Sequence, residues 1–185
     1  LADEKGEDMI VPKFFYYGEK KLWMAGGYMD EWRALGVHYG MNKEDSPAFN
    51  VAKHCTYSPT CFMLVKKEVF EKVGIMDERY FAYYDDTDFV LRATRMGYRI
   101  FYDPSLVLLH KVSSSVGTNS PFYVYYSNRN KIYFIRKNFR GFRRYFALGY
   151  TLLSRVAFWL SFDKVRKQKL IQGLKEGFRM KPGNT

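Results

Sequence analysis

The chain has 185 residues, of which 47% are hydrophobic, and a formal net charge of +11. This length fits one domain, with or without an appendage, and the hydrophobic content excludes an intrinsically disordered chain. Aromatic residues reach 19%, with 16 Tyr beside 16 Phe, which indicates rings with one polar edge at a cleft or an interface.

The positive charge lies in the C-terminal third of the chain. Residues 1–126 contain 15 basic and 17 acidic residues, a net charge of −2, whereas residues 127–185 contain 15 basic and 2 acidic residues, a net charge of +13. Such a tail indicates an anionic partner, either a nucleic acid or the anionic face of a membrane. The opening residues have neither the basic start nor the apolar run of a signal peptide, which favours a cytosolic location.

The first part of the chain predicts short strands and turns. Residues 8–27 have the pattern of a strand, a turn at Gly18 and a second strand over 22–25. Residues 28–54 are polar and weakly patterned, which predicts a loop with edge pairing near Val37.

An apolar run and a short helix follow. Residues 61–65 form a run short enough for a buried strand, and residues 68–73 predict a helix that ends at Gly74. Cys55 and Cys61 have no metal-ligand spacing, so we expect both to be reduced and structural.

An acidic cluster precedes the next helix. Asp85 or Asp86 is a suitable cap, apolar residues follow at helical spacing, and Gly97 ends the helix. Residues 98–102 and 106–109 then predict two strands separated by an Asp-Pro pair.

The basic tail predicts three helices, over about 122–138, 142–161 and 163–178. The middle one contains 18 residues that are apolar apart from Ser and Arg155. A central arginine costs about 2.5 kcal/mol or more inside a bilayer, so a helix lying in the membrane interface is favoured over a spanning one. Packing of these apolar side chains on the domain is the alternative.

Three carboxylates and one histidine carry the candidate chemistry: Asp85, Asp86, Asp88 and His110. A group transfer onto a hydroxyl needs a carboxylate to take the proton of the attacking hydroxyl, and positive charge against an anionic leaving group. Considered alone, acidic residues at a helix start are also favoured by the helix macrodipole, and a single His after an apolar strand is commonly a surface or core-edge residue.

Taken together, residues 60–117 resemble the segment of family 2 glycosyltransferases that runs from an acceptor-side strand, through an acidic motif, to a strand ending in His. The resemblance implies an α/β fold: part of a GT-A fold, with an acceptor-side mixed sheet and helices over 1–120 and a helical, basic, membrane-peripheral extension over 121–185. The matching residues are 63–67, 68–74, 76–78, 85–88, 91–93, 97–99, Pro104 and 110–111, with thinner matches at 22–27, 129–130 and 173–179.

The resemblance implies a role for each residue of the acidic motif. Asp86 occupies the position of the catalytic base. Asp85 occupies a position where the family usually has Glu, whose side chain is longer, and is implied to contact the acceptor. Asp88 matches a third, substrate-binding carboxylate, for which bonding to nearby backbone amides is the alternative. His110 matches a ligand of a divalent cation, Mg²⁺ or Mn²⁺, whose other ligands are expected in the donor-binding half.

Further substrate-binding residues are implied by the same resemblance. Thr60 and Cys61 stand where relatives commonly have a small Gly-Ala pair facing the sugar, and Trp23 matches a position beside the cleft. Lys111 opens the loop 111–117, which resembles a flexible segment that closes over the donor.

The implied partners are a nucleoside-diphosphate sugar, a saccharide or lipid-linked acceptor, and an anionic membrane surface, with no nucleic acid. These partners fit bacterial cell-surface polysaccharide synthesis at the inner face of the cytoplasmic membrane. Similar sequences are most often described as transferring rhamnose from a deoxythymidine diphosphate donor. Family members bind the donor through an N-terminal Rossmann-like portion, for which the region before Leu22 is too short. We therefore expect the chain to be inactive without that half.

Two other functions remain open at this stage. The first is a non-catalytic module for a membrane or a partner, built on the acceptor half as a scaffold. The second is a basic nucleic-acid binder, which requires binding that depends steeply on salt. The acidic motif weighs against the second.

Overall fold

The structure is a computed structural model that describes residues 6–111, 117 and 119–182. The chain divides into two compact units. Of the described residues, the first unit contains 6–29, 36–77 and 86–111, and the second contains 30–35, 78–85, 117 and 119–182.

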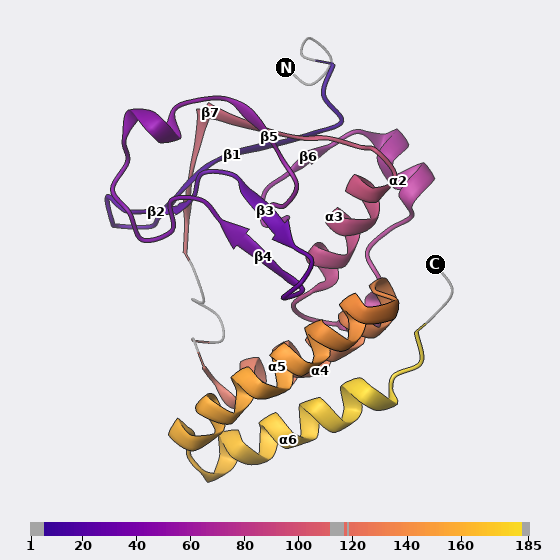
Figure 1. The fold of residues 1–185 in the computed structure, drawn as a ribbon. Helices are drawn as coiled ribbons and strands as arrows, with labels where there is room; N and C mark the ends of the chain where they lie inside the picture. The colour runs from indigo at the N-terminus through magenta and orange to yellow at the C-terminus, as the bar shows by residue number, and fades with distance from the viewer. Residues whose placement is uncertain (1–5, 112–116, 118, 183–185) are drawn as a thin grey trace. The chain divides into compact units, whose positions relative to one another are not determined.

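The first unit is built on a five-stranded mixed sheet (Figure 1). Its central strand β1 (Met9–Tyr16) pairs in parallel with β7 (Ile100–His110), and β5 (Lys53–Cys55) adds to the far edge of β7. On the other edge of β1, β2 (Leu22–Met24) and β6 (Leu64–Val65) pair antiparallel with its opposite ends. The predicted strand, turn and strand over 8–27 are therefore confirmed.

The two strands predicted over 98–102 and 106–109 are one strand, so that prediction was wrong. Asp103 pairs with Pro12, but the next pair joins Val107 to Lys13, which leaves an irregularity inside β7. Proline has no N–H to donate to a strand ladder, and Pro104 lies within this irregularity, where none is needed. The Asp-Pro pair therefore bends the strand without ending it.

The apolar run 61–65 is not a buried strand. Thr60 and Cys61 form a turn, β6 contains only Leu64 and Val65, and Phe62 and Leu64 are exposed. An apolar run alone does not distinguish a buried strand from an exposed edge. The edge pairing predicted near Val37 is confirmed, since β3 (Gly27–Asp30) pairs with β4 (Leu35–His38).

Two helices accompany the sheet. α2 (Lys67–Val73) ends at Gly74, whose φ of 80° is the left-handed conformation that glycine adopts at little cost. α3 (Asp85–Arg95) buries Phe89, Val90 and Ala93 in the core that contains Met9, Val11, Ile100 and Tyr102 of the central strands.

The second unit contains the three helices predicted for the tail (Figure 1). α4 (Pro121–Asn138) begins where the Ser120 hydroxyl accepts the Tyr123 N–H at 3.1 Å. α5 (Gly141–Ser161) follows, and α6 (Lys164–Arg179) begins where the Asp163 carboxylate accepts the Arg166 N–H at 2.8 Å. Such side-chain caps satisfy N–H groups that a helix start leaves without a partner.

α4 and α6 pack with their backbones in close approach. A Cβ added to Gly173 would lie 2.5 Å from the Tyr125 carbonyl oxygen, and one added to Gly177 would lie 2.5 Å from that of Arg129. The glycines of the 173–179 stretch are therefore required by helix packing.

Replacing Gly177 by Ala is expected to lower the free energy of unfolding by about 1–3 kcal/mol, because the added methyl group collides with a backbone that cannot move aside alone. Thermal or urea unfolding measures this change. The matched control is Gly149→Ala on α5, where an added Cβ meets nothing within 4 Å. That variant should be neutral or stabilised by up to about 1 kcal/mol, and equal effects of the two changes would contradict the packing argument.

α5 presents apolar side chains to its outside. Its exposed stripe consists of Phe142 and Tyr145 near the start of the helix and Leu153, Val156 and Leu160 in its second half. Among the described residues, no helix has the length and apolar character needed to cross a bilayer.

Candidate active site

Asp85 and Asp86 form the start of α3, and both side chains are partly exposed. Oδ1 of Asp86 accepts the backbone N–H of Thr87 at 2.6 Å and the Thr87 hydroxyl at 3.1 Å. These two bonds hold the carboxylate in one orientation. An oriented carboxylate at a solvent-accessible helix start can accept a proton from a hydroxyl placed against it.

Asp88 lies in the interior. Its carboxylate is fully buried, and its Oδ2 pairs with Nε of Arg92 at 2.9 Å. Arg92 also donates to the carbonyl oxygens of Val73 and Ile75, the latter at 2.8 Å, so the pair ties α3 to the end of α2. Substrate contact by Asp88 stays a prediction, and the structure gives this carboxylate a packing role.

The loop that leads into Asp85 has an unusual backbone. Phe81, Tyr83 and Tyr84 have φ values of 64°, 64° and 70°. Residues other than glycine rarely adopt this left-handed region, because each such residue costs about 1–3 kcal/mol. Such a loop persists only where its surroundings hold it.

Two adjacent residues of α4 hold this loop. Nδ2 of Asn130, which is fully buried, lies within hydrogen-bonding distance of the carbonyl oxygens of Tyr80 at 2.8 Å, Tyr83 at 2.9 Å and Ala82. Arg129 donates to the Tyr80 carbonyl oxygen at 2.7 Å and to that of Arg79. An amide NH₂ has two hydrogens, so the three carbonyl groups share them.

His110 ends β7 beside Trp23 of β2. The two ring centroids lie 4.3 Å apart, and Phe14 lies against both rings. Burial lowers the pKa of His110, which keeps its imidazole neutral near pH 7. A neutral imidazole can offer a lone pair to a cation or accept a hydrogen bond.

His38 approaches Trp23 as well. Its ring centroid lies 4.8 Å from that of Trp23, and its Nδ1 lies 3.3 Å from the Trp23 carbonyl oxygen. Burial lowers the pKa of His38, and the hydrogen bond to the Trp23 carbonyl oxygen partly opposes this shift. Sequence analysis did not select His38, because only the packing of β4 beside β2 brings it to Trp23.

The described residues do not form a complete metal site. Among them, no group of three His, Cys, Asp or Glu side chains is arranged to hold an ion. Metal binding by His110 therefore stays a prediction that depends on ligands from elsewhere.

The remaining predicted site residues are Cys61, Thr60 and Lys111. Desolvation by the surrounding protein and, to a lesser degree, the charge of Asp86 raise the pKa of Cys61 to about 11, so the thiol is protonated and near the proposed base. Cys61 is at the surface and not in the core, whereas Cys55 is buried, and both are free. Thr60 is partly exposed. Exposed Lys111 places its Nζ 4.4 Å from the centre of the Tyr17 ring, and residues 112–116 of its loop lie outside the described residues.

Comparison with known proteins supports a glycosyltransferase. No protein-family model matches the chain. Over 83 residues it is 35% identical to the dTDP-rhamnosyl transferase RfbF of Shigella flexneri, covering 40% of this chain and 28% of that protein. Over 119 residues it is 29% identical to an N-acetylglucosaminyl-diphospho-decaprenol L-rhamnosyltransferase of Mycobacterium tuberculosis, covering 60% of this chain and 38% of that protein.

The chain thus spans well under half the length of these relatives. Their names agree with the glycosyl-transfer chemistry expected of the acidic motif, and the mixed α/β architecture is compatible with part of a Rossmann-like glycosyltransferase. Assignment to family 2 and to a GT-A fold stays a prediction.

Proposed function

We propose that the chain is the acceptor-side and C-terminal part of an inverting glycosyltransferase of cell-surface polysaccharide synthesis. The observation that carries this proposal is the oriented carboxylate of Asp86 at the start of α3, next to a strained loop held by Asn130. The names of two relatives, both rhamnosyltransferases, support it.

In the proposed reaction Asp86 takes the proton of an acceptor hydroxyl as its oxygen attacks the anomeric carbon of the donor sugar. The bond from that carbon to the diphosphate breaks, and the departing nucleoside diphosphate takes the electron pair. His110 is proposed as one ligand of a divalent cation, Mg²⁺ or Mn²⁺. The donor-binding portion is proposed to lie outside this segment, so the segment by itself is inactive.

The proposed acceptor is lipid-linked. One relative acts, by its name, on a diphospho-decaprenol-linked sugar, and a prenyl diphosphate saccharide is the corresponding substrate class here. Deoxythymidine diphosphate rhamnose is the first donor to test, because another relative is named for it. The assay uses the full-length gene product, a panel of sugar nucleotides and the release of nucleoside diphosphate as its readout.

Attachment to the anionic inner face of the cytoplasmic membrane belongs to the same proposal. The exposed stripe of α5 offers apolar side chains, and the +13 net charge of residues 127–185 supplies attraction to anionic lipid. A helix with these properties lies in the interface with its apolar face among the lipid headgroups and upper acyl chains.

The change Leu153→Asp is expected to weaken binding to phosphatidylglycerol vesicles about tenfold or more, because burying a leucine side chain contributes about 1.5–3 kcal/mol. Vesicle sedimentation measures the partition coefficient. Leu153 is 75% exposed, so the fold should be unaffected. The matched control is Ile75→Asp in the first unit, at a residue 70% exposed, and an equal loss there would argue against α5 as the attachment surface.

A further inference from the structure

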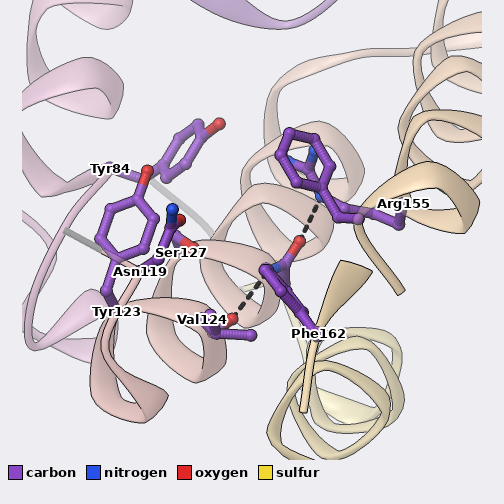
Figure 2. Close-up of a pocket in the computed structure, with 9 residues that line it drawn as sticks. Tyr84, Asn119, Tyr123, Val124, Ser127, Arg155 and Phe162 are labelled. Atoms are coloured by element: carbon purple, nitrogen blue, oxygen red, sulfur yellow. Dashed lines mark hydrogen bonds between the residues drawn. The ribbon is translucent and has the colours of Figure 1, made fainter. Parts of the chain in front are cut away.

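A pocket of about 180 Å³ lies within the second unit, between α4 and α5. In Figure 2, Tyr84 and Tyr123 lie on one side of it, and Arg155 and Phe162 lie on the opposite side. The lining residues that matter for its chemistry are Tyr84, Tyr123, Asn128, Arg155, Phe158 and Phe162.

Arg155 supplies a cation to this pocket from the middle of an otherwise apolar helix. Its Nε donates to Oδ1 of Asn128, and Nδ2 of Asn128 donates to the Val124 carbonyl oxygen at 2.6 Å (Figure 2). α4 thus fixes the amide that orients the guanidinium. A guanidinium has five N–H donors, and the described bonds, including one to Ser154, use Nε and Nη1.

A second cation, which is buried and does not line the pocket, lies close enough to Arg155 to be affected by its charge. Lys131, one turn after Asn128 on α4, is 4% exposed. Burial lowers its pKa to about 8, with further lowering by the charges of Arg155 and Arg33. Asp30 opposes this effect, but its carboxylate is paired with Arg33 at 2.6 Å.

α5 also contains a buried hydroxyl group that does not line the pocket. Thr151, one turn before Arg155 on α5, is fully buried, and among the described residues its Oγ1 has no hydrogen-bond partner. A buried cation close to a second cation destabilises a fold unless an anion compensates the charge. Arg155 and Lys131 together therefore favour an anion with several acceptor oxygens.

The rest of the pocket identifies the kind of anion. Rings of Phe158, Phe162, Tyr84 and Tyr123 line it beside Arg155, which suits an apolar chain attached to the anionic group. The exposed stripe on the outside of the same helix would place such a chain close to lipid.

We propose that the pocket between Arg155 and Asn128 binds the diphosphate group of a prenyl-linked acceptor. This inference rests on the proposed function and extends it by assigning the acceptor's charged group to the second unit. Arg155 bonds the diphosphate oxygens, Lys131 contributes charge from nearby, and the aromatic rings contact the first isoprene units.

The test measures binding without turnover. The full-length protein is titrated by calorimetry with farnesyl diphosphate, inorganic diphosphate, farnesol, and phosphatidylglycerol vesicles in competition. We expect farnesyl diphosphate to bind at least about tenfold more tightly than inorganic diphosphate, because the rings add apolar contact. Farnesol should not bind measurably, and the vesicles should not displace farnesyl diphosphate from the pocket.

Three variants locate the site. Arg155→Met and Lys131→Met should each weaken farnesyl diphosphate binding at least about tenfold, which corresponds to loss of one strong charged contact. Lys131→Met should also raise the melting temperature of the unliganded protein, since it removes a buried cation; this separates lost binding from lost folding. Arg143→Met, which removes an arginine of α5 paired with Glu31, is the matched control and should bind normally.

Normal binding by both pocket variants would overturn the proposal, as would displacement by phosphatidylglycerol vesicles, which would indicate a general headgroup site. These outcomes are independent of catalysis. Asp86→Asn should bind farnesyl diphosphate normally while losing turnover, so failure of the pocket and failure of the proposed reaction are distinguishable.

Discussion

Replacing Asp86 by Asn is expected to lower glycosyl transfer by about 100-fold to 10,000-fold in the full-length protein, the range typical for removal of a general base. Asparagine keeps the oxygen that accepts the Thr87 bonds, so the start of α3 should remain formed. It cannot accept the hydroxyl proton. Release of nucleoside diphosphate, measured with the donor that the wild-type protein uses, checks the prediction.

The control for Asp86→Asn tests whether the loss of a negative charge at a helix start is enough to lower turnover. Glu68 is an exposed carboxylate in the first turn of α2, so Glu68→Gln removes a comparable charge from a comparable place. It should change turnover by less than about twofold and cost at most about 1 kcal/mol of stability. If Asp86→Asn turns over as well as Glu68→Gln, Asp86 is not the base and the non-catalytic scaffold becomes the better account.

Replacing Asn130 by Ala is expected to lower the free energy of unfolding by about 2–4 kcal/mol, because it removes the amide that donates to the Ala82 and Tyr83 carbonyl oxygens. The same loop contains three left-handed residues whose strain the amide holds in place. Urea unfolding measures the loss. Because this loop leads directly into Asp85, turnover should fall as well, even at temperatures where the protein remains folded.

Asn138→Ala serves as the matched control for Asn130. It removes the same side chain from the end of the same helix, where the amide donates to the Phe134 carbonyl oxygen at 3.1 Å. We expect a cost of about 1 kcal/mol, typical of a single hydrogen bond. Equal costs at the two positions would mean that other contacts hold the loop.

Local patterns in the sequence determined much of this structure. The three C-terminal helices, the strand and turn at residues 9–24, and the end of α2 at Gly74 were all predicted. Hydrophobic periodicity, helix caps and glycine act within a few residues, so their effects can be predicted before the tertiary structure is known. The acidic start of α3 belongs to the same class, although the catalytic role of Asp86 stays a prediction.

Tertiary structure alone decided which residues surround the candidate site. Asn130 bonds carbonyl groups nearly 50 residues away, His38 reaches Trp23 through the approach of separate strands, and Asp88 is a buried partner of Arg92. Likewise, β7 pairs with β1 on both sides of the Asp-Pro irregularity, so the two predicted strands form one continuous strand. These contacts join residues far apart in the chain or depend on burial, and the free energy that selects them arises only when the whole core packs.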